Sequence, residues 1–136
     1  MILADTSGVV ATLVRQDPAH ERAVRYTRSL REPLYLPTAC VGEIGYFLEQ
    51  RASADVEARF LRSLTTGPFL AIEAQAPDYL RAADLVLQYA DFPLGAVDAL
   101  IVAIAERLNV TTILTLDRRH FSAVRPLHRR SVTLVP

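Results

Sequence analysis

The sequence predicts an α/β sandwich with a mostly parallel central sheet. Short apolar runs typical of buried strands alternate with longer segments of helical periodicity. The 136 residues fit a single domain, 1–136, without a repeat, a linker or a low-complexity tract. Strands separated by helices favour parallel pairing, because parallel strands need a long crossover connection.

The first half of the chain is predicted to contain two strands and four helices. Ile2–Ala4 is an apolar run that stops at Asp5–Ser7, three residues that favour the N-cap of a helix. Pro33–Pro37 encloses the second extended segment. The expected helices extend to about Val14, from Asp17 to about Arg31, from Thr38 to about Arg51 and from Ser53 toward Leu64.

The second half is predicted to contain three strands and two helices. Gly67-Pro68 breaks the chain before the strand-like run Phe69–Ile72. Thr111–Leu116 is β-branched and apolar, which indicates a strand, and Val132–Val135 is a weaker last strand. The expected helices run from Pro77 to about Tyr89 and from Ala96 to Leu108.

Composition indicates a soluble domain that folds without disulfides. Cys40 is the only cysteine, so no internal disulfide can form and a reducing compartment is expected. There is no run of about 18 apolar residues and no basic secretion signal, so we expect a cytoplasmic protein without a membrane span.

The basic residues are all arginine, although the formal net charge is zero. Five of them lie between Arg118 and Arg130, in a stretch without an acid. Because the guanidinium group binds phosphate through a planar fork of donors, this stretch favours a nucleic-acid partner. Genomic base composition is the alternative explanation for the absence of lysine.

Two acids are predicted to end strands of the sheet. Asp5 follows the first strand, and Asp117 follows the strand that ends at Leu116. If these strands are parallel neighbours, both carboxylates lie at the carboxyl edge of the sheet, where ligands bind in such folds. Each acid could equally be an ordinary helix cap.

Two further acids border apolar helix faces. Asp98 lies at the margin of the face that contains Ile101 and Ile104, and Glu43 lies next to Phe47. A partly buried carboxylate needs a cation or hydrogen-bond donors. The alternatives are pairing with an arginine for Asp98 and an ordinary surface charge for Glu43.

Carboxylates that converge at one edge predict a divalent cation. Two like charges ~4 Å apart repel by roughly 4 kcal/mol at an effective dielectric of 20. Carboxylate oxygens suit Mg²⁺, with Mn²⁺ as a second possibility. Zinc is not expected, because the histidines, His20, His120 and His128, lack zinc-like spacing. Receiver-domain and haloacid-dehalogenase-like chemistry is not expected either, because both use a lysine.

An ordered set of motifs covers the whole chain: Ile2–Ser7, Glu43, Tyr89–Ala99, Ala105–Leu108 and Ile113–Phe121. Together they resemble the PIN-domain ribonucleases and, within them, the VapC toxins of type II VapBC toxin–antitoxin systems. The resemblance implies a PIN-like three-layer α/β/α sandwich.

The resemblance also implies a set of site residues. The family's metal-binding acids fall on Asp5, Glu43, Asp98 and Asp117, with Asp5 and Asp98 as the foremost direct ligands. Many relatives have another acid where this chain has Gly95, which leaves a second metal in question. Candidates for supporting roles are Thr6, Ser7 and Asp91 near the metal, and Arg118, Arg119 and Arg125 for RNA binding.

The function implied is that of a Mg²⁺-dependent endoribonuclease toxin. It would cleave a tRNA or rRNA loop with activated water, leaving 5′-phosphate and 3′-hydroxyl ends. A VapB-type antitoxin, a homodimer and a toxin–antitoxin hetero-oligomer are the expected partners. A catalytically silent PIN-like RNA-binding or interaction module and a DNA nuclease remain alternatives. Phe47, Phe60 and Leu61 belong either to the core or to a partner groove.

Overall fold

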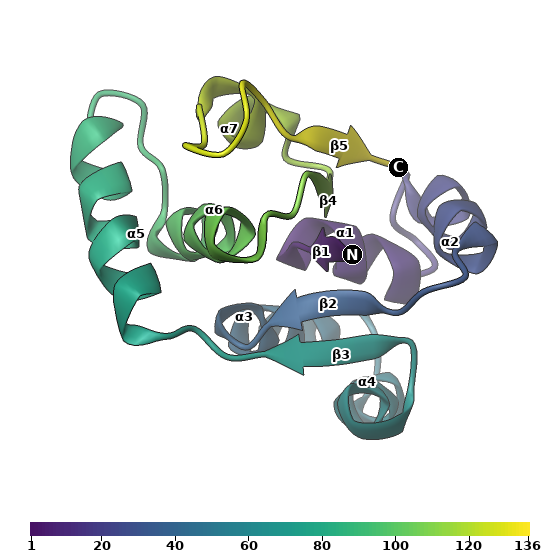
Figure 1. Ribbon diagram of the computed structural model, residues 1–136. Helices are drawn as coiled ribbons and strands as arrows, with labels where there is room; N and C mark the ends of the chain where they lie inside the picture. The colour runs from purple at the N-terminus through teal and green to yellow at the C-terminus, as the bar shows by residue number, and fades with distance from the viewer.

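A five-stranded parallel sheet forms the centre of the computed structural model, which describes residues 1–136 (Figure 1). Figure 1 shows α5 and α6 on the left of the central strands and α2 on the right. In chain order the elements are β1 (Ile2–Ala4), α1 (Thr6–Leu13), α2 (His20–Ser29), β2 (Leu34–Pro37), α3 (Ala39–Arg51), α4 (Ala54–Thr66), β3 (Phe69–Ile72), α5 (Ala76–Gln88), α6 (Ala96–Leu108), β4 (Thr112–Leu114), α7 (Arg118–Ala123) and β5 (Thr133–Val135).

The strand order is β3-β2-β1-β4-β5, and every neighbouring pair is parallel. All three residues of β1 are buried, because helices cover both faces of the sheet at its centre. Leu3 of β1 is in register with Ile113 of β4, so the carboxyl ends of these strands lie side by side. The predicted α/β sandwich is confirmed, and its sheet is entirely parallel.

The predicted helices and strands are present, with shifted ends and one addition. Helix α6 has the predicted bounds. Helix α2 begins at His20 and not at Asp17, because the Asp17 carboxylate accepts a hydrogen bond from the Ala19 amide in a preceding turn. The short helix α7 was not predicted; Asp117 caps it by accepting a hydrogen bond from the His120 amide.

The aromatic residues considered for a partner groove divide between core and surface. Phe60 is 1% exposed and its ring packs edge-on against Phe69, with centroids 6.2 Å apart, so it belongs to the core. Phe47 is partly buried against the core, whereas Leu61 is 48% exposed. None of the helices is of a length and hydrophobicity that would let it cross a membrane.

Gly8 allows α1 to approach the end of β4. A Cβ atom at this position would lie 2.6 Å from the Leu114 carbonyl oxygen and 2.8 Å from its Cγ. No larger residue fits without moving α1 away from the strand. The glycine therefore brings the first turn of α1 to the edge where Asp5 and Asp117 lie.

We predict that Gly8→Ala destabilises the fold by about 1–3 kcal/mol, the usual cost of overpacking a buried contact. Gly42→Ala is the matched control, since a Cβ there meets nothing within 4 Å and lies within α3. It should stabilise by about 0.5–1 kcal/mol through helix propensity. Urea unfolding of the three proteins measures both changes, and equal midpoints would contradict the role assigned to Gly8.

Candidate metal centre

A pocket of about 250 Å³ at the carboxyl edge of the sheet is lined by Asp17 and by all four of the predicted acids. The four predicted acids come from four places in the chain: Asp5 after β1, Glu43 on α3, Asp98 on α6 and Asp117 after β4. The predicted convergence of these side chains is therefore present in the structure. Arg51 also lines the pocket but forms no ion pair with any of them, and its guanidinium lies over the Phe47 ring, 4.9 Å from the centroid.

Asp5 is fixed by a network of hydroxyl groups. Its Oδ2 accepts hydrogen bonds from Ser7 Oγ at 2.6 Å, from Thr115 Oγ1 at 2.8 Å and from the Ser7 amide at 3.3 Å. Oδ1 has no protein partner, although the residue is 4% exposed. The network thus orients the carboxylate and leaves one oxygen for a ligand.

The same hydroxyl groups join the ends of β1 and β4. Ser7 Oγ accepts a hydrogen bond from the Leu116 amide at 2.9 Å, and Thr115 Oγ1 accepts one from the Asp117 amide at 2.9 Å. Ser7, predicted as a supporting residue, therefore holds Asp5 and the segment before Asp117 together. Thr115 was not predicted from the sequence, although its place at the end of a strand directly before Leu116-Asp117 was a usable signal.

Glu43 reaches the pocket from the first half of α3. The Thr6 hydroxyl donates to Glu43 Oε2 at 2.7 Å, and Thr6 itself is buried in the first turn of α1. Glu43 is exposed, unlike Asp5. Thr6 therefore orients a carboxylate that solvent can reach.

Asp98 has neither a hydrogen bond nor an ion pair to its carboxylate. Burial, together with the nearby charges of Asp5 and Asp117, raises the pKa of Asp98 to about 6. The position in the first turn of α6 favours a negative charge, but desolvation and like charges outweigh it. A carboxylate in this situation is stabilised most directly by a cation.

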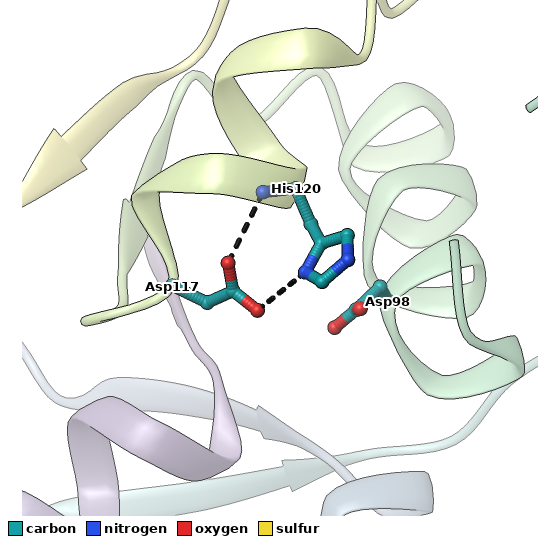
Figure 2. A group of neighbouring side chains, drawn as sticks. All are labelled: Asp98, Asp117 and His120. Carbon is teal, nitrogen blue, oxygen red and sulfur yellow. Dashed lines mark hydrogen bonds and ion pairs between the residues drawn. The ribbon is translucent and has the colours of Figure 1, made fainter. Parts of the chain in front are cut away.

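Asp117, in contrast to Asp98, has hydrogen bonds to its carboxylate. Burial alone would raise its pKa, but hydrogen bonds from the His120 side chain and amide lower it below the usual value. His120 Nδ1 lies 2.6 Å from Asp117 Oδ2 (Figure 2). One ligand atom each from Asp98, Asp117 and His120 lie within 4.8 Å of one another, a group that includes neither Asp5 nor Glu43.

His120 was not predicted as a site residue, because the three histidines lack zinc-like spacing in the sequence. The usable signal was its position three residues after Asp117, which brings the two side chains together on one helical turn. Gly95 is also close: a Cβ there would lie 3.8 Å from Asp98 Oδ2. An acid at this position would therefore add a carboxylate beside Asp98, and glycine omits it.

The remaining predicted residues lie outside the pocket. Asp91 is exposed in the turn between α5 and α6. Arg118 donates to the Pro136 carbonyl oxygen, and the Arg119 guanidinium lies over the Phe92 ring, 5.1 Å from its centroid. The Arg125 side chain is exposed. No arginine between residues 118 and 130 forms an ion pair with a carboxylate.

The donor set fits a divalent metal ion. Asp5, Glu43 and Asp98 have no arginine partner, so their charges are uncompensated within the protein. Asp5 Oδ1 and both oxygens of Asp98 are free of protein hydrogen bonds. Hard oxygen ligands with open positions suit Mg²⁺ and Mn²⁺.

The PIN domain family profile matches residues 2–126, and the chain belongs to this family. Within it, the chain is similar to the VapC ribonuclease toxins, as its motifs implied. It is 34% identical to the ribonuclease VapC26 of Mycobacterium tuberculosis (strain ATCC 25618 / H37Rv) over 135 residues, which cover 99% of this chain and 100% of that protein. PIN-domain ribonucleases use a divalent metal ion.

Solved structures share the fold. VapC20 of Mycobacterium tuberculosis, a sarcin–ricin loop cleaving toxin, superimposes with a TM-score of 0.85 at 18% identity over 100% of both chains. FitAcB from Neisseria gonorrhoeae gives a TM-score of 0.70 at 23% identity, covering 100% of this chain and 97% of that one. These likenesses confirm the three-layer PIN-like architecture.

We predict that Asp98→Asn stabilises the metal-free protein at pH 8. The folded-state pKa of about 6 lies above the ordinary value of 3.8, so the wild type loses stability as pH rises through this interval. The gain should be about 1–2 kcal/mol, reduced by partial solvent exposure, and should disappear near pH 4. Urea unfolding with chelator, with Asp91→Asn as the control, measures it; a gain independent of pH would show that titration of Asp98 is not its cause.

Proposed function

We propose that this chain is the toxin of a toxin–antitoxin pair and a metal-dependent endoribonuclease that cleaves a structured RNA loop, in tRNA or rRNA, in the cytoplasm. The observation that carries the proposal is the convergence of Asp5, Glu43, Asp98 and Asp117 without a protein cation to neutralise the first three. The chemistry is that of phosphodiester hydrolysis by water. Mg²⁺ is the proposed ion, with Mn²⁺ as the other candidate.

In the proposed mechanism, some residues of the pocket bind the metal ion and others orient these ligands. Asp5 and Asp98 would hold the divalent ion, which would supply a water of lowered pKa and a polarised scissile phosphate. Ser7 and Thr115 keep Asp5 in one orientation. Thr6 does the same for Glu43. Water attacks in line, so the products carry a 5′-phosphate and a 3′-hydroxyl, and the RNA 2′-hydroxyl takes no part.

Arginines near the pocket are proposed to bind the RNA backbone. Arg118 and Arg119 begin helix α7 directly after Asp117, and Arg125 follows that helix. None of the three forms an ion pair with an acidic side chain, so each can contact a phosphate, Arg118 after releasing its hydrogen bond to the Pro136 oxygen. Stacking on Phe92 restricts the motion of Arg119 beside the metal centre.

An antitoxin is the proposed protein partner. One neighbouring structure is a toxin–antitoxin complex from Klebsiella pneumoniae, and another is VapBC2 from Rickettsia felis bound to a promoter DNA fragment. A groove of about 870 Å³ lies between α1, α2 and α4 and contains apolar residues such as Val24, Val56 and Leu30. Arg51 lines both this groove and the acidic pocket, so a VapB-type segment in the groove would reach the metal centre. We also infer a homodimer, alone or within a toxin–antitoxin hetero-oligomer.

We predict that the purified chain cleaves structured RNA with Mg²⁺ and that chelator abolishes the cleavage. Asp98→Asn should reduce the rate at least about 100-fold through the loss of a charged ligand. Asp91→Asn, in an exposed turn outside the pocket, should retain the wild-type rate. Mapping of 5′ ends across cellular RNA identifies the target and the end chemistry.

Three outcomes would contradict the proposal. A 2′,3′-cyclic phosphate among the products would show that the RNA 2′-hydroxyl, and not water, is the nucleophile. Metal binding without turnover on any cellular RNA would favour the catalytically silent RNA-binding or interaction module. Cleavage of DNA in preference to RNA would favour the DNA nuclease.

We predict that Arg119→Gln weakens RNA binding and reduces the slope of log affinity against log salt by about 1. Arg62→Gln is the matched control, because Arg62 is an exposed arginine on α4 that lines neither the acidic pocket nor the apolar groove. Fluorescence anisotropy measures the RNA affinity and its salt dependence for both variants, each combined with Asp98→Asn so that the RNA is not cleaved. An unchanged slope in Arg119→Gln would show that Arg119 does not contact the RNA backbone.

A further inference from the structure

His120 is the one nitrogen donor beside the metal-binding acids. Among all histidine, cysteine and acidic side chains, the group close enough to share an ion is Asp98, Asp117 and His120, within 4.8 Å of one another. Figure 2 shows the imidazole ring over the space between the two carboxylates, with Nδ1 toward Asp117 and the other nitrogen on the side of α6. One ring nitrogen is therefore within reach of an ion that the two carboxylates would hold.

The surroundings of His120 fix the ring in this orientation. The backbone is part of α7, and Nδ1 lies 2.6 Å from Asp117 Oδ2. The Phe92 ring lies next to the imidazole ring, with the two ring centroids 5.2 Å apart and the two ring planes at 56° to each other. When Nδ1–H donates to Asp117, the lone pair of the neutral ring is on Nε2, which has no hydrogen-bond partner in the protein.

We propose that His120 is a metal ligand through Nε2, alongside Asp98, and that Asp117 holds the imidazole in position. A carboxylate that accepts from the far nitrogen of a ligating histidine is a recurring arrangement at metal sites, where it fixes the tautomer and raises the basicity of the ligand. The inference rests on the metal centre of the proposed function and adds a ligand to it.

A nitrogen ligand changes which ion the site prefers. Mg²⁺ is bound almost entirely by oxygen, whereas imidazole suits first-row transition ions. Gly95 strengthens the effect, because it leaves out the extra carboxylate that an acid would place near Asp98 Oδ2. The mixed nitrogen and oxygen donor set therefore favours Mn²⁺, the second candidate ion of the proposed function, more than an all-oxygen set would.

Pulsed electron paramagnetic resonance of the full chain loaded with Mn²⁺ tests the ligand directly. We expect a ¹⁴N coupling of a coordinated imidazole that changes on ¹⁵N-histidine labelling and is lost in His120→Gln. His128→Gln is the matched control and should keep the coupling, because His128 Nε2 is bound to the Val110 carbonyl oxygen outside the pocket. Absence of the coupling in the wild type, or its persistence in His120→Gln, overturns the proposal.

Calorimetric titration separates ligation from positioning. If His120 ligates the metal, His120→Gln should weaken Mn²⁺ binding by about 10–100-fold and Mg²⁺ binding by less than about 3-fold. If His120 only orients Asp117, both ions should weaken equally, which overturns the proposal. Because the labelled wild type reports the ligand by itself, misfolding of the variant does not remove the test.

The outcome is distinguishable from failure of the proposed function. RNA cleavage by a wild type without ¹⁴N coupling would leave the ribonuclease assignment intact and remove His120 from the ligand set. A ¹⁴N coupling lost in His120→Gln, without cleavage of any RNA, would keep the ligand and overturn the proposed function.

Discussion

Repulsion between carboxylates at one edge of the sheet is the constraint on which the site depends. Asp5 and Asp117 meet because β1 and β4 are parallel neighbours, and α3 and α6 add Glu43 and Asp98. The fold provides neutral donors or a histidine for three of the four carboxylates and none for Asp98, whose pKa rises to about 6 through burial and the nearby acids. A divalent cation bound at this edge would relieve the repulsion.

The helix that carries Asp98 is anchored away from the site by partly buried ion pairs. Arg107 of α6 forms an ion pair with Asp78 of α5, which is 2% exposed. Arg81 of α5 donates a bidentate pair of hydrogen bonds to Glu106 of α6. Breaking one partner of such a pair leaves a buried charge and is costly. These arginines serve the structure, whereas those between 118 and 130 form no ion pair with an acidic side chain.

Much of the fold and most of the candidate acids could be predicted from the sequence. The apolar runs at Ile2–Ala4 and Thr111–Leu116 predicted buried strands, and the acids that follow them were expected at a common edge if the two strands were parallel neighbours, which they are. Local capping signals were also present at Asp117, but they were insufficient to predict α7. A six-residue helix has too few turns for a periodic pattern, and packing of Phe121 in the core stabilises it.

The sequence by itself determined the alternation of strands and helices and the places of Asp5 and Asp117 at strand ends, because hydrophobic periodicity and strand ends are local properties. Only the tertiary structure decided the contacts that give the acids their character: the hydroxyl network of Ser7 and Thr115, and the placement of His120 between Asp98 and Asp117. The physical reason is that pKa values and ligand geometry depend on distances of a few ångströms between segments far apart in the chain, which no local pattern encodes.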